Sequence, residues 1–422
     1  MDQRWILHCD CNSFFASVEL LEHPELKELP VAVCGSVDDR HGIILAKNEA
    51  AKKFGIKTAE TVWQAKKKCP QLQFLPPHMS KYRAMSRRIN EIYARYTDLV
   101  EAFSVDESWL DVTHSYRLFE NDPVALADRI RAEVRQETGI TISVGVSYTK
   151  VFAKLGSDFK KPDATTFLPP QAIPEKVWPL DVGELLFVGR HTRELLQANR
   201  IHTIGQLAAA PPEYLEKLLG KMGHQLSDAA RGLNDAPVHP VGWHEPPKSV
   251  GNGMTFRRDL VSAADIRLGV GVLADSVAAR LRRAALYCTA VSVQIKDTDL
   301  HSISRQKQLP YATDLEKDIA AAALELITEN WPQGKPIRLI TVTAMNLTED
   351  EVPAQTEMLK APPKPDEKRA RLERAMDDIR RRHGKGSLLA ANVLGNDIGI
   401  SDGAGGHGDG EEPLPADRPR DL

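Results

Sequence analysis

The sequence is poor in cysteine, and the few cysteines match no zinc or disulfide pattern. There are five, with no CxxC pair among them: Cys9, Cys11, Cys34, Cys69 and Cys288. Zinc sites and disulfide-stapled secreted domains need cysteines paired at short, regular spacings, so the pattern argues against both. Cys9 and Cys11 would share one face of a strand, where we expect small buried side chains rather than metal ligands.

Long hydrophobic runs are also missing. No stretch approaches the roughly 20 apolar residues of a membrane span. The first ten residues, MDQRWILHCD, lack the basic-then-apolar layout of a signal peptide. A composition of 42% hydrophobic and 27% charged residues fits a soluble globular protein. We therefore expect a cytoplasmic protein without a membrane partner, and the length of 422 residues predicts about two to four domains.

The net charge is small, at −3, and it is unevenly distributed. Residues 386–422 carry seven acids against two bases, a net charge of −5, so the preceding residues together carry +2. A mildly basic body with an acidic tail neither proves nor excludes a polyanionic partner, because clustered charge matters more than the total.

Residues 1–178 alternate short apolar runs with helical patterns, which predicts a mixed α+β unit. The expected elements are strands over 5–9, 31–35 and 140–146 and helices over 80–96 and 123–136. Residues 179–236 then predict short helices, with a glycine turn at Gly189-Arg190. Free backbone N–H groups at such a helix start bind phosphate, so both residues are candidate DNA contacts, although simple packing explains the hairpin equally well.

Residues 237–247 form a linker rich in proline and glycine, and residues 248–350 follow a β-α-β-β-α-β order. That order predicts a four-stranded sheet under one layer of helices. Acids and bases are about equal there, so a DNA-binding face needs segregated bases, for which the candidates are Lys248, Arg257, Arg258, Arg305 and Lys307.

Residues 351–422 form a tail that begins beyond the last predicted strand. One charged helix is expected over 366–383, with Leu372, Met376 and Ile379 on one stripe. From Gly395 onward the sequence is acidic and of low complexity, and we expect it to be disordered.

Two acidic motifs interrupt apolar strands. Asp10 follows one strand, and Asp106-Glu107 lies within FSVDESWLDV, residues 103–112. A helix cap also explains Asp10, and an exposed edge or tight hairpin explains the pair. If the strands are neighbours, three carboxylates converge and need cations among them, which two Mg²⁺ ions of a phosphoryl-transfer site supply. Because adjacent strand residues point to opposite faces, we expect the backbone to turn or bulge at Asp106-Glu107.

Three motifs, in order, resemble the signatures of Y-family translesion DNA polymerases. DCNSFFASVE (10–19) resembles D-x-x-x-F-[FY]-A-x-V-E, and SVDESWLD (104–111) resembles S-[IV]-D-E-x-[YFW]-L-D. SVG (143–145), KVFAK (150–154) and Lys161-Pro162 are similar to the S-x-G-[IV]…N-K-x-[LF]-A-K…K-P block. Over residues 5–350 the resemblance implies a right-hand polymerase with a ferredoxin-like palm and small fingers, a helix-hairpin-helix thumb, and a β-α-β-β-α-β little finger.

The resemblance also implies roles for the acids. Asp10 and Asp106 would bridge two Mg²⁺ ions, and Glu107 would bind the ion at the primer 3′-hydroxyl. The backbone carbonyl of Cys11 would complete one metal shell. Whether the chain is DinB-like or UmuC-like stays open.

Further residues are implied to contact the nucleotide. Phe15 matches the steric gate that excludes a ribose 2′-hydroxyl; a core phenylalanine is the alternative, which Phe14 fits better. Phe14, Lys52 and Lys161 are implied nucleotide contacts. The chain departs from the pattern where many relatives carry Tyr and Arg, because Glu49 and Lys52 stand there, so Lys52 alone is a candidate triphosphate clamp.

The implied function is low-fidelity, template-directed DNA synthesis by a monomer that uses primer-template DNA and deoxynucleoside triphosphates. A sliding-clamp partner is suggested by Gln355, Met358 and Leu359, although the usual final aromatic is missing and an ordinary linker is the slightly favoured alternative. A non-catalytic DNA-damage scaffold and another two-metal nucleotidyl or cyclase enzyme are the other candidates. The three acids argue against the scaffold, and the thumb and little-finger patterns argue against the other enzyme.

Overall fold

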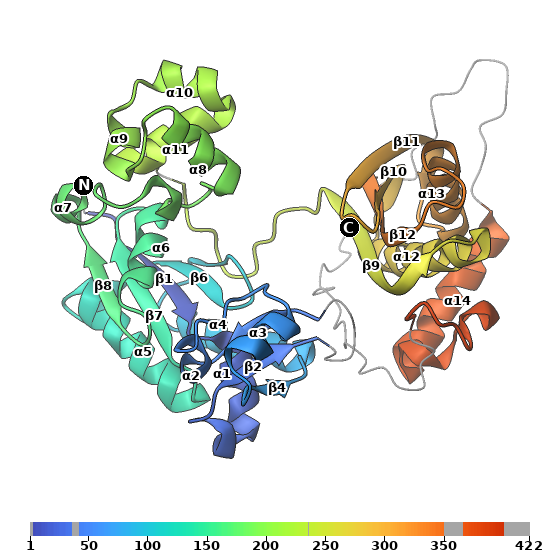
Figure 1. The fold of residues 1–422 in the computed structure, drawn as a ribbon. Helices are drawn as coiled ribbons and strands as arrows, with labels where there is room; N and C mark the ends of the chain where they lie inside the picture. Colours follow the sequence, from blue (N-terminus) through green and yellow to red (C-terminus); the bar gives the residue numbers. More distant parts are fainter. Residues whose placement is uncertain (1–2, 36–41, 235, 350–365, 401–422) are drawn as a thin grey trace, which may run out of the picture. The chain divides into compact units, whose positions relative to one another are not determined.

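The computed structural model describes residues 3–35, 42–234, 236–349 and 366–400 (Figure 1). These residues form two compact units, and the division falls between His244 and Glu245. The mixed α+β class predicted from the sequence is confirmed. Among the described residues, no helix combines the length and the hydrophobicity that a membrane span requires.

The first unit is built on a five-stranded sheet of order β5-β6-β1-β7-β8. Its strands are β1 Ile6–Cys11, β5 Val100–Ala102, β6 Glu107–Asp111, β7 Ile142–Ser147 and β8 Thr165–Leu168. β1 lies between β6 and β7 and runs antiparallel to both. All six residues of β1 are buried, including the polar His8 and Asp10 among its apolar residues.

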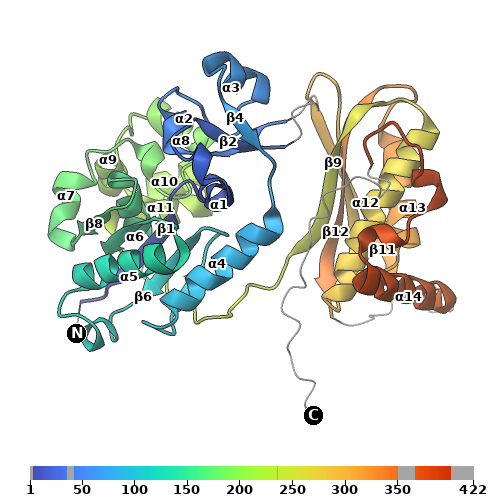
Figure 2. The same ribbon diagram turned by 90° about the horizontal axis from the view of Figure 1, so that it is seen from below.

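Helices cover both faces of this sheet (Figures 1 and 2). The helices are α1 Phe14–Glu22, α4 Met79–Tyr93, α5 Pro123–Thr138 and α6 Lys150–Phe159. Leu7 and Cys9 of β1 pack into the core with α4 and α5, whereas Ile6 packs with Ala153 of α6 on the opposite face. At Gly145 on β7 a Cβ would overlap the carbonyl oxygen of Ala153, so this glycine lets α6 lie directly on the sheet.

Two smaller modules complete the first unit. One is a three-stranded sheet of order β3-β2-β4 with two short helices: β2 Val31–Cys34, β3 Ile44–Lys47, β4 Gln73–Leu75, α2 Glu49–Lys52 and α3 Val62–Lys68. The other is helical: α7 Ile173–Lys176, α8 Arg190–Ala198, α9 Ile204–Ala209, α10 Pro212–Leu219 and α11 Lys221–Arg231. Thr203 and Gln206 form a capping box at the start of α9, which satisfies its first free N–H groups.

The second unit has the element order strand, helix, strand, strand, helix, strand. The elements are β9 Ser249–Leu260, α12 Ala263–Arg283, β10 Tyr287–Lys296, β11 Ser302–Thr313, α13 Glu316–Asn330 and β12 Ile337–Thr348. The strands form an antiparallel sheet of order β11-β10-β12-β9, and α12 and α13 cover one face of it (Figure 2). Their apolar sides, with Val270 and Leu326 among them, form the core of this unit.

The other face of this sheet carries small and polar side chains. Gly251 and Gly253 of β9 lie opposite Thr343 and Thr341 of β12, and a Cβ on either glycine would meet the facing threonine. Arg305 and Lys307 of β11 do not belong to this open face. They contact α13 instead, through Asn330 at 3.0 Å for Arg305 and through Glu325 for Lys307. The predicted segregation of bases therefore does not include these two residues.

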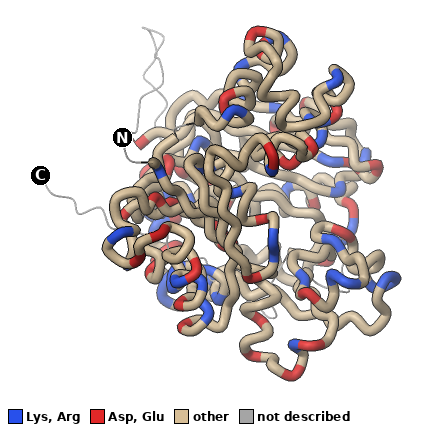
Figure 3. Tube along the Cα trace, turned by 90° about the vertical axis from the view of Figure 1, so that its left-hand side faces the viewer, with Lys and Arg blue, Asp and Glu red and all other residues tan. Residues whose placement is uncertain are grey.

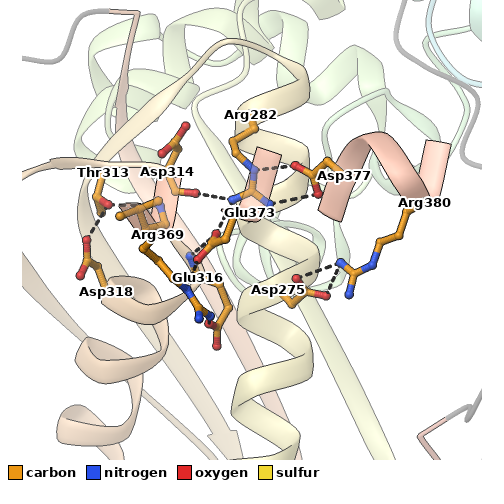
Figure 4. Close-up of polar contacts among 11 residues, drawn as sticks. Asp275, Arg282, Thr313, Asp314, Glu316, Asp318, Arg369, Glu373, Asp377 and Arg380 are labelled. Atoms are coloured by element: carbon orange, nitrogen blue, oxygen red, sulfur yellow. Dashed lines mark hydrogen bonds and ion pairs between the residues drawn. The ribbon is translucent and has the colours of Figure 1, made fainter. Parts of the chain in front are cut away.

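The C-terminal part of the described chain packs on the second unit through charged residues. Helix α14, Glu367–His383, contacts α12 and α13 by a set of ion pairs that we call the helix cluster (Figure 4). At its centre, Arg282 of α12 lies 2.6 Å from both Glu373 and Asp377 and donates to the Asp314 carbonyl oxygen at 2.8 Å. Further pairs are Arg369 with Glu316 and Arg380 with Asp275.

Two predictions for the tail need correction. Leu372 and Ile379 of the apolar stripe are 50% and 42% exposed, because α14 docks through its charged side instead. Disorder from Gly395 is wrong for residues 395–400: Ile398 and Ile400 are buried in the core of the second unit, and Ile398 O accepts a 2.9 Å hydrogen bond from Arg257 N. The low-complexity composition of this segment gives no indication that Ile398 and Ile400 pack into the core of the second unit. Residues 401–422 lie outside the described residues.

Candidate active site

Asp10 and Glu107 lie directly opposite each other on neighbouring strands. The antiparallel register of β1 and β6 pairs Asp10 with Glu107 and His8 with Trp109. Cross-strand partners project from the same face of a sheet, so both carboxylates lie on the side covered by α6. His8, two residues before Asp10 on the same face, contacts Ser157 of α6 at 2.9 Å.

Asp106 is held beside these acids by a turn. Residues 103–106 connect β5 to β6, and the N–H groups of Phe103 and Ser104 donate to Glu107 O at 2.9 and 3.2 Å. Ser104 Oγ donates to Asp106 Oδ1 at 2.6 Å, and Cys11 N donates to Asp106 O at 3.0 Å. The expected turn at the acids is confirmed, and residues 103–112 are a hairpin turn followed by a strand rather than one strand.

Two lysines of the 150–162 segment reach the facing acids. Lys161 Nζ lies 2.6 Å from Asp10 Oδ2 and 2.6 Å from Asp158 Oδ1. Lys154 Nζ on α6 lies 2.8 Å from Glu107 Oε2. Asp106 has no ion-pair partner within the described ranges. We call Asp10, Asp106, Glu107, Lys154 and Lys161 the strand-end cluster.

The pKa values of the two facing carboxylates move in opposite directions. Burial raises the pKa of Asp10 to about 7, although the Lys161 ammonium beside it opposes that shift. Burial also pushes the pKa of Glu107 upward, but the adjacent His8 ring and Lys154 ammonium outweigh burial and lower it to about 2. Burial lowers the pKa of His8. For Asp10, burial disfavours the charged carboxylate more strongly than Lys161 favours it.

The chemistry of these donors fits a hard divalent cation. Three carboxylates and the backbone carbonyl of Cys11 supply only oxygen atoms, which Mg²⁺ prefers. The thiols of Cys9 and Cys11 do not compete, because burial raises the pKa of both and keeps them protonated. The cysteines are all buried and free, as expected of small core residues.

Phe15 and Phe14 occupy different environments at the start of α1. Phe15 is partly exposed and stacks on Tyr82 of α4, with ring centroids 4.1 Å apart and an interplanar angle of 10°. Tyr82 is fully buried and its hydroxyl donates to Glu19 at 2.5 Å. Phe14 is only 3% exposed and belongs to the core, which supports packing rather than a direct nucleotide contact for its side chain.

Lys52 lies on the short helix α2 and is partly exposed. Its Nζ pairs with Glu49 at 2.5 Å, three residues earlier, and Glu49 also accepts a 3.2 Å hydrogen bond from Ser13 at the start of α1. This chain of contacts links α2 to the segment that carries Asp10, but no contact joins Lys52 to the strand-end cluster among the described residues.

The candidate DNA contacts belong to other parts of the chain than the sheet that carries the acids. Gly189 is the N-cap of α8, and the Arg190 side chain is 92% exposed and pairs with Glu194 at 2.8 Å. In the second unit, Lys248 is 86% exposed next to β9 and pairs with Glu245 at 3.0 Å, and Arg257 is exposed on β9.

Two predictions remain: Arg258 as a candidate DNA contact, and the possible clamp contacts in residues 355–359. Arg258 is held by Asp265 at 3.0 Å and Asp397 at 2.7 Å. Gln355, Met358 and Leu359 lie outside the described residues. Lys and Arg are interspersed with Asp and Glu along the trace in Figure 3.

Three supporting residues were not assigned from the sequence. Tyr82 backs Phe15, Ser104 holds Asp106, and His8 fills the space between Glu107 and α6. Ser104 lies inside the acidic motif, and His8 is on the face of β1 that carries Asp10, so both had a local signal. Tyr82 had none, because only the fold brings α4 under α1.

Comparisons with known proteins show the family of this chain. Residues 9–158 match the model of the impB/mucB/samB family, and residues 247–358 match the C-terminal domain of the same family. A DNA polymerase IV of Acetivibrio thermocellus is 44% identical over 395 residues, which cover 93% of this chain and 98% of that relative. This chain belongs to the Y-family of DNA polymerases.

Other relatives and a solved structure extend the comparison. A DNA polymerase IV of Moorella thermoacetica is 39% identical over 92% of this chain and 97% of its own length. DNA polymerase IV 1 of Bacillus subtilis is 39% identical over 82% of this chain and 83% of its own length. A Y-family DNA polymerase chimera of known structure has the same fold, with a TM-score of 0.73 at 23% identity over 82% of this chain and all of that one.

Proposed function

We propose that this chain is a DNA-directed DNA polymerase that extends a primer 3′ end opposite a template and works at low fidelity across damaged bases. The observation that carries the proposal is the strand-end cluster, where Asp10 faces Glu107 and Asp106 is tied to the end of β1. A DNA-binding scaffold has no use for three acids at one point. The relatives named DNA polymerase IV support the catalytic function.

Asp10, Asp106 and Glu107, with the Cys11 carbonyl, are the residues that would hold two Mg²⁺ ions. When bound, these ions lower the pKa of the primer 3′-hydroxyl and neutralise charge on the transferred phosphate. The protein orients the ligands: Lys154 fixes Glu107 at 2.8 Å, and Ser104 fixes Asp106 at 2.6 Å. Such support holds carboxylates in place before substrate arrives.

Lys161 binds the triphosphate of the incoming nucleotide in this proposal. Its ammonium is shared between Asp10 and Asp158 and is 30% exposed, so it can exchange a carboxylate for phosphate oxygen. Lys52 is a second phosphate contact, and it must leave its ion pair with Glu49 before it can bind phosphate. Phe15 acts as the steric gate, because a ring stacked on a fully buried tyrosine cannot yield to a 2′-hydroxyl.

The modules take the roles of a right hand. The five-stranded sheet with its helices is the palm, and the three-stranded sheet with α2 and α3 is the fingers. Helices α8–α11 are the thumb, where the N-terminus of α8 at Gly189 and Arg190 meets DNA phosphate. The second unit up to β12 is the little finger, which uses Lys248, Arg257 and its open face of small residues against the DNA backbone.

Primer extension on undamaged and lesion-bearing templates tests this function. We expect Mg²⁺-dependent extension on both templates, with frequent misincorporation, and no extension after chelation of the metal. Binding of the same DNA without any extension at saturating nucleotide would contradict the proposal and favour a scaffold.

A further inference from the structure

The turn that carries Lys161 is anchored to α5 by Arg131. Arg131 Nη2 donates to the backbone oxygen and to Oδ1 of Asp163, at 2.5 and 2.8 Å. Its Nη1 donates to Asp128 Oδ1 at 2.7 Å. The Arg131 and Asp163 side chains are 19% and 26% exposed, whereas Asp128 is 54% exposed, so the contact with Asp163 is the better shielded half of this fork. Ion pairs with two-point geometry and low exposure hold backbone far better than exposed single contacts.

Asp163 requires such an anchor. Its φ of 51° lies in the left-handed region, which is uncommon for residues other than glycine, although aspartate adopts it more readily than most. The Asp163 N–H donates to Asn12 Oδ1 at 2.9 Å, and Asn12 Nδ2 donates to Ser143 Oγ at 2.8 Å. The turn is therefore held on one side by the end of β1 and on the other by α5.

Lys161 lies two residues before Asp163, so the contacts that hold Asp163 also fix the backbone position from which the Lys161 side chain extends. A lysine side chain is flexible, and fixing its backbone is the means by which the fold directs its ammonium. From this position Lys161 reaches both Asp10 and Asp158 at 2.6 Å. Without Arg131, Asp163 would keep, of the described bases on α5, only the exposed Arg135, at 3.2 Å, so the short 161–163 segment would loosen and the ammonium would shift from the strand-end cluster.

We propose that Arg131 is a positioning residue for Lys161 and thereby sets the affinity for the triphosphate of the incoming nucleotide. The inference rests on the proposed function, in which Lys161 contacts that triphosphate. Arginine suits the task because its planar fork serves Asp163 and Asp128 together. Lysine offers one point charge in its place.

Single-nucleotide kinetics on a primer-template test the inference with Arg131→Ala, Arg131→Lys, Lys161→Ala and the double variant Arg131→Ala/Lys161→Ala. We expect Arg131→Ala to raise KM for the deoxynucleotide by about tenfold or more, with kcat nearly unchanged. Arg131→Lys keeps the charge and should fall between Arg131→Ala and the unmodified chain. The double variant should match Lys161→Ala, because a residue that acts only through Lys161 has nothing left to position.

Arg129→Ala is the matched control. Arg129 is on the same helix, is 49% exposed, and pairs with Glu120 at 3.3 Å, away from the turn. This variant loses the same charge from α5 and should leave KM unchanged. Nucleotide affinity can also be measured by fluorescence on a dideoxy-terminated primer, where no turnover occurs. In Arg131→Ala this affinity should fall in parallel with the rise in KM.

Different failures separate the two proposals. An unchanged KM in Arg131→Ala, or fully additive effects in the double variant, would overturn the positioning role. An unchanged KM in Lys161→Ala would remove Lys161 as a triphosphate contact and the inference with it. Neither result touches the polymerase assignment, which depends on extension by the unmodified chain.

Discussion

The strand-end cluster and the helix cluster contain the same kinds of residue but are built in opposite ways. In the helix cluster, Arg282 is 6% exposed and Glu373 is 3% exposed, and α14 docks on the second unit through them (Figure 4). In the strand-end cluster the bases are Lys154 and Lys161, which are 18% and 30% exposed. The centre of the helix cluster is closed to solvent, whereas the lysines of the strand-end cluster are accessible.

The difference lies in how fully each acid is satisfied. Glu373 accepts from Arg282, Arg369 and the backbone N–H of Glu316, so its oxygens have no need of an additional cation. Asp106 lacks an ion-pair partner in the part of the chain that the structure describes, and Asp10 retains a pKa raised to about 7 by burial despite Lys161. Saturated arginine forks join elements of the fold, whereas in our proposal Asp106 and the partly exposed lysines of the strand-end cluster serve metal and phosphate.

The largest expected effect separates the clusters by activity. Asp106→Ala should lower primer extension by roughly 10³-fold or more, because several kcal/mol of charge stabilisation by the metals is lost. Thermal unfolding and DNA affinity should stay close to those of the unmodified chain, since Asp106 pairs with no base in the described part of the chain. Extension assays with Mg²⁺, unfolding curves and DNA titrations give the three readouts.

Asp378→Ala is the control for this change. Asp378 is an exposed acid of α14 that pairs only with the nearby Arg381 among the described residues. Its loss should leave extension intact. Robust extension by Asp106→Ala would exclude Asp106 from the metal site and erase the contrast between the two clusters.

The second prediction concerns the helix cluster, where we expect a loss of stability without a loss of activity. Arg282→Met should lower the free energy of unfolding of the second unit by about 3 kcal/mol, because buried Glu373 keeps only Arg369 as a cation among the described residues and half-buried Asp377 loses the arginine that it pairs with. The rate of the chemical step should be unchanged. Chemical denaturation measures the loss, and the double variant Arg282→Met/Glu373→Leu should recover part of it, since two apolar residues replace a broken ion pair. A stable single variant with impaired chemistry would mean that the helix cluster serves the reaction.

A third change tests whether the aromatic stack beside the strand-end cluster works by shape. Phe15→Ala should raise ribonucleotide incorporation relative to deoxynucleotide by roughly 10-fold to 100-fold, because the wall against the 2′-hydroxyl is gone. Tyr82→Phe keeps the ring under Phe15 and loses only the hydroxyl contact with Glu19, so it should preserve sugar discrimination. Single-nucleotide kinetics with both sugar types decide this, and unchanged discrimination in Phe15→Ala would remove Phe15 as the gate.

The strand-end cluster was predictable from the sequence to an unusual depth because its acids interrupt apolar strands. The hairpin explanation for FSVDESWLDV is what the structure shows: residues 103–106 are the turn, and that turn keeps Asp106 next to Cys11, where the proposed metal site requires it. A local pattern identified the acids, while the pairing of β1 with β6 that unites them required the resemblance or the fold.

The helix cluster was not predictable in the same way. Its partners come from α12, α13 and α14, up to 95 positions apart in the case of Arg282 and Asp377. The apolar stripe of α14 suggested packing through Leu372 and Ile379, yet both are exposed, because the charged side gains arginine forks that no short window of sequence reveals. Periodicity locates a helix but does not establish which side docks when ion pairs and apolar contacts compete.

The smallest expected effect concerns two bases of the second unit that differ in the same way as the clusters. Lys248 is 86% exposed and has one partner among the described residues, Glu245, whereas Arg258 is held by Asp265 and Asp397. Lys248→Ala should weaken DNA binding by roughly threefold and reduce the salt dependence of binding by about one phosphate contact. Arg258→Ala should instead loosen the 395–400 segment and leave the salt dependence unchanged. DNA titrations at several salt concentrations measure both variants. If Lys248→Ala and the unmodified chain show the same dependence of DNA affinity on salt concentration, Lys248 is not a DNA contact despite its exposure. The bases that bind DNA would then lie elsewhere on this unit.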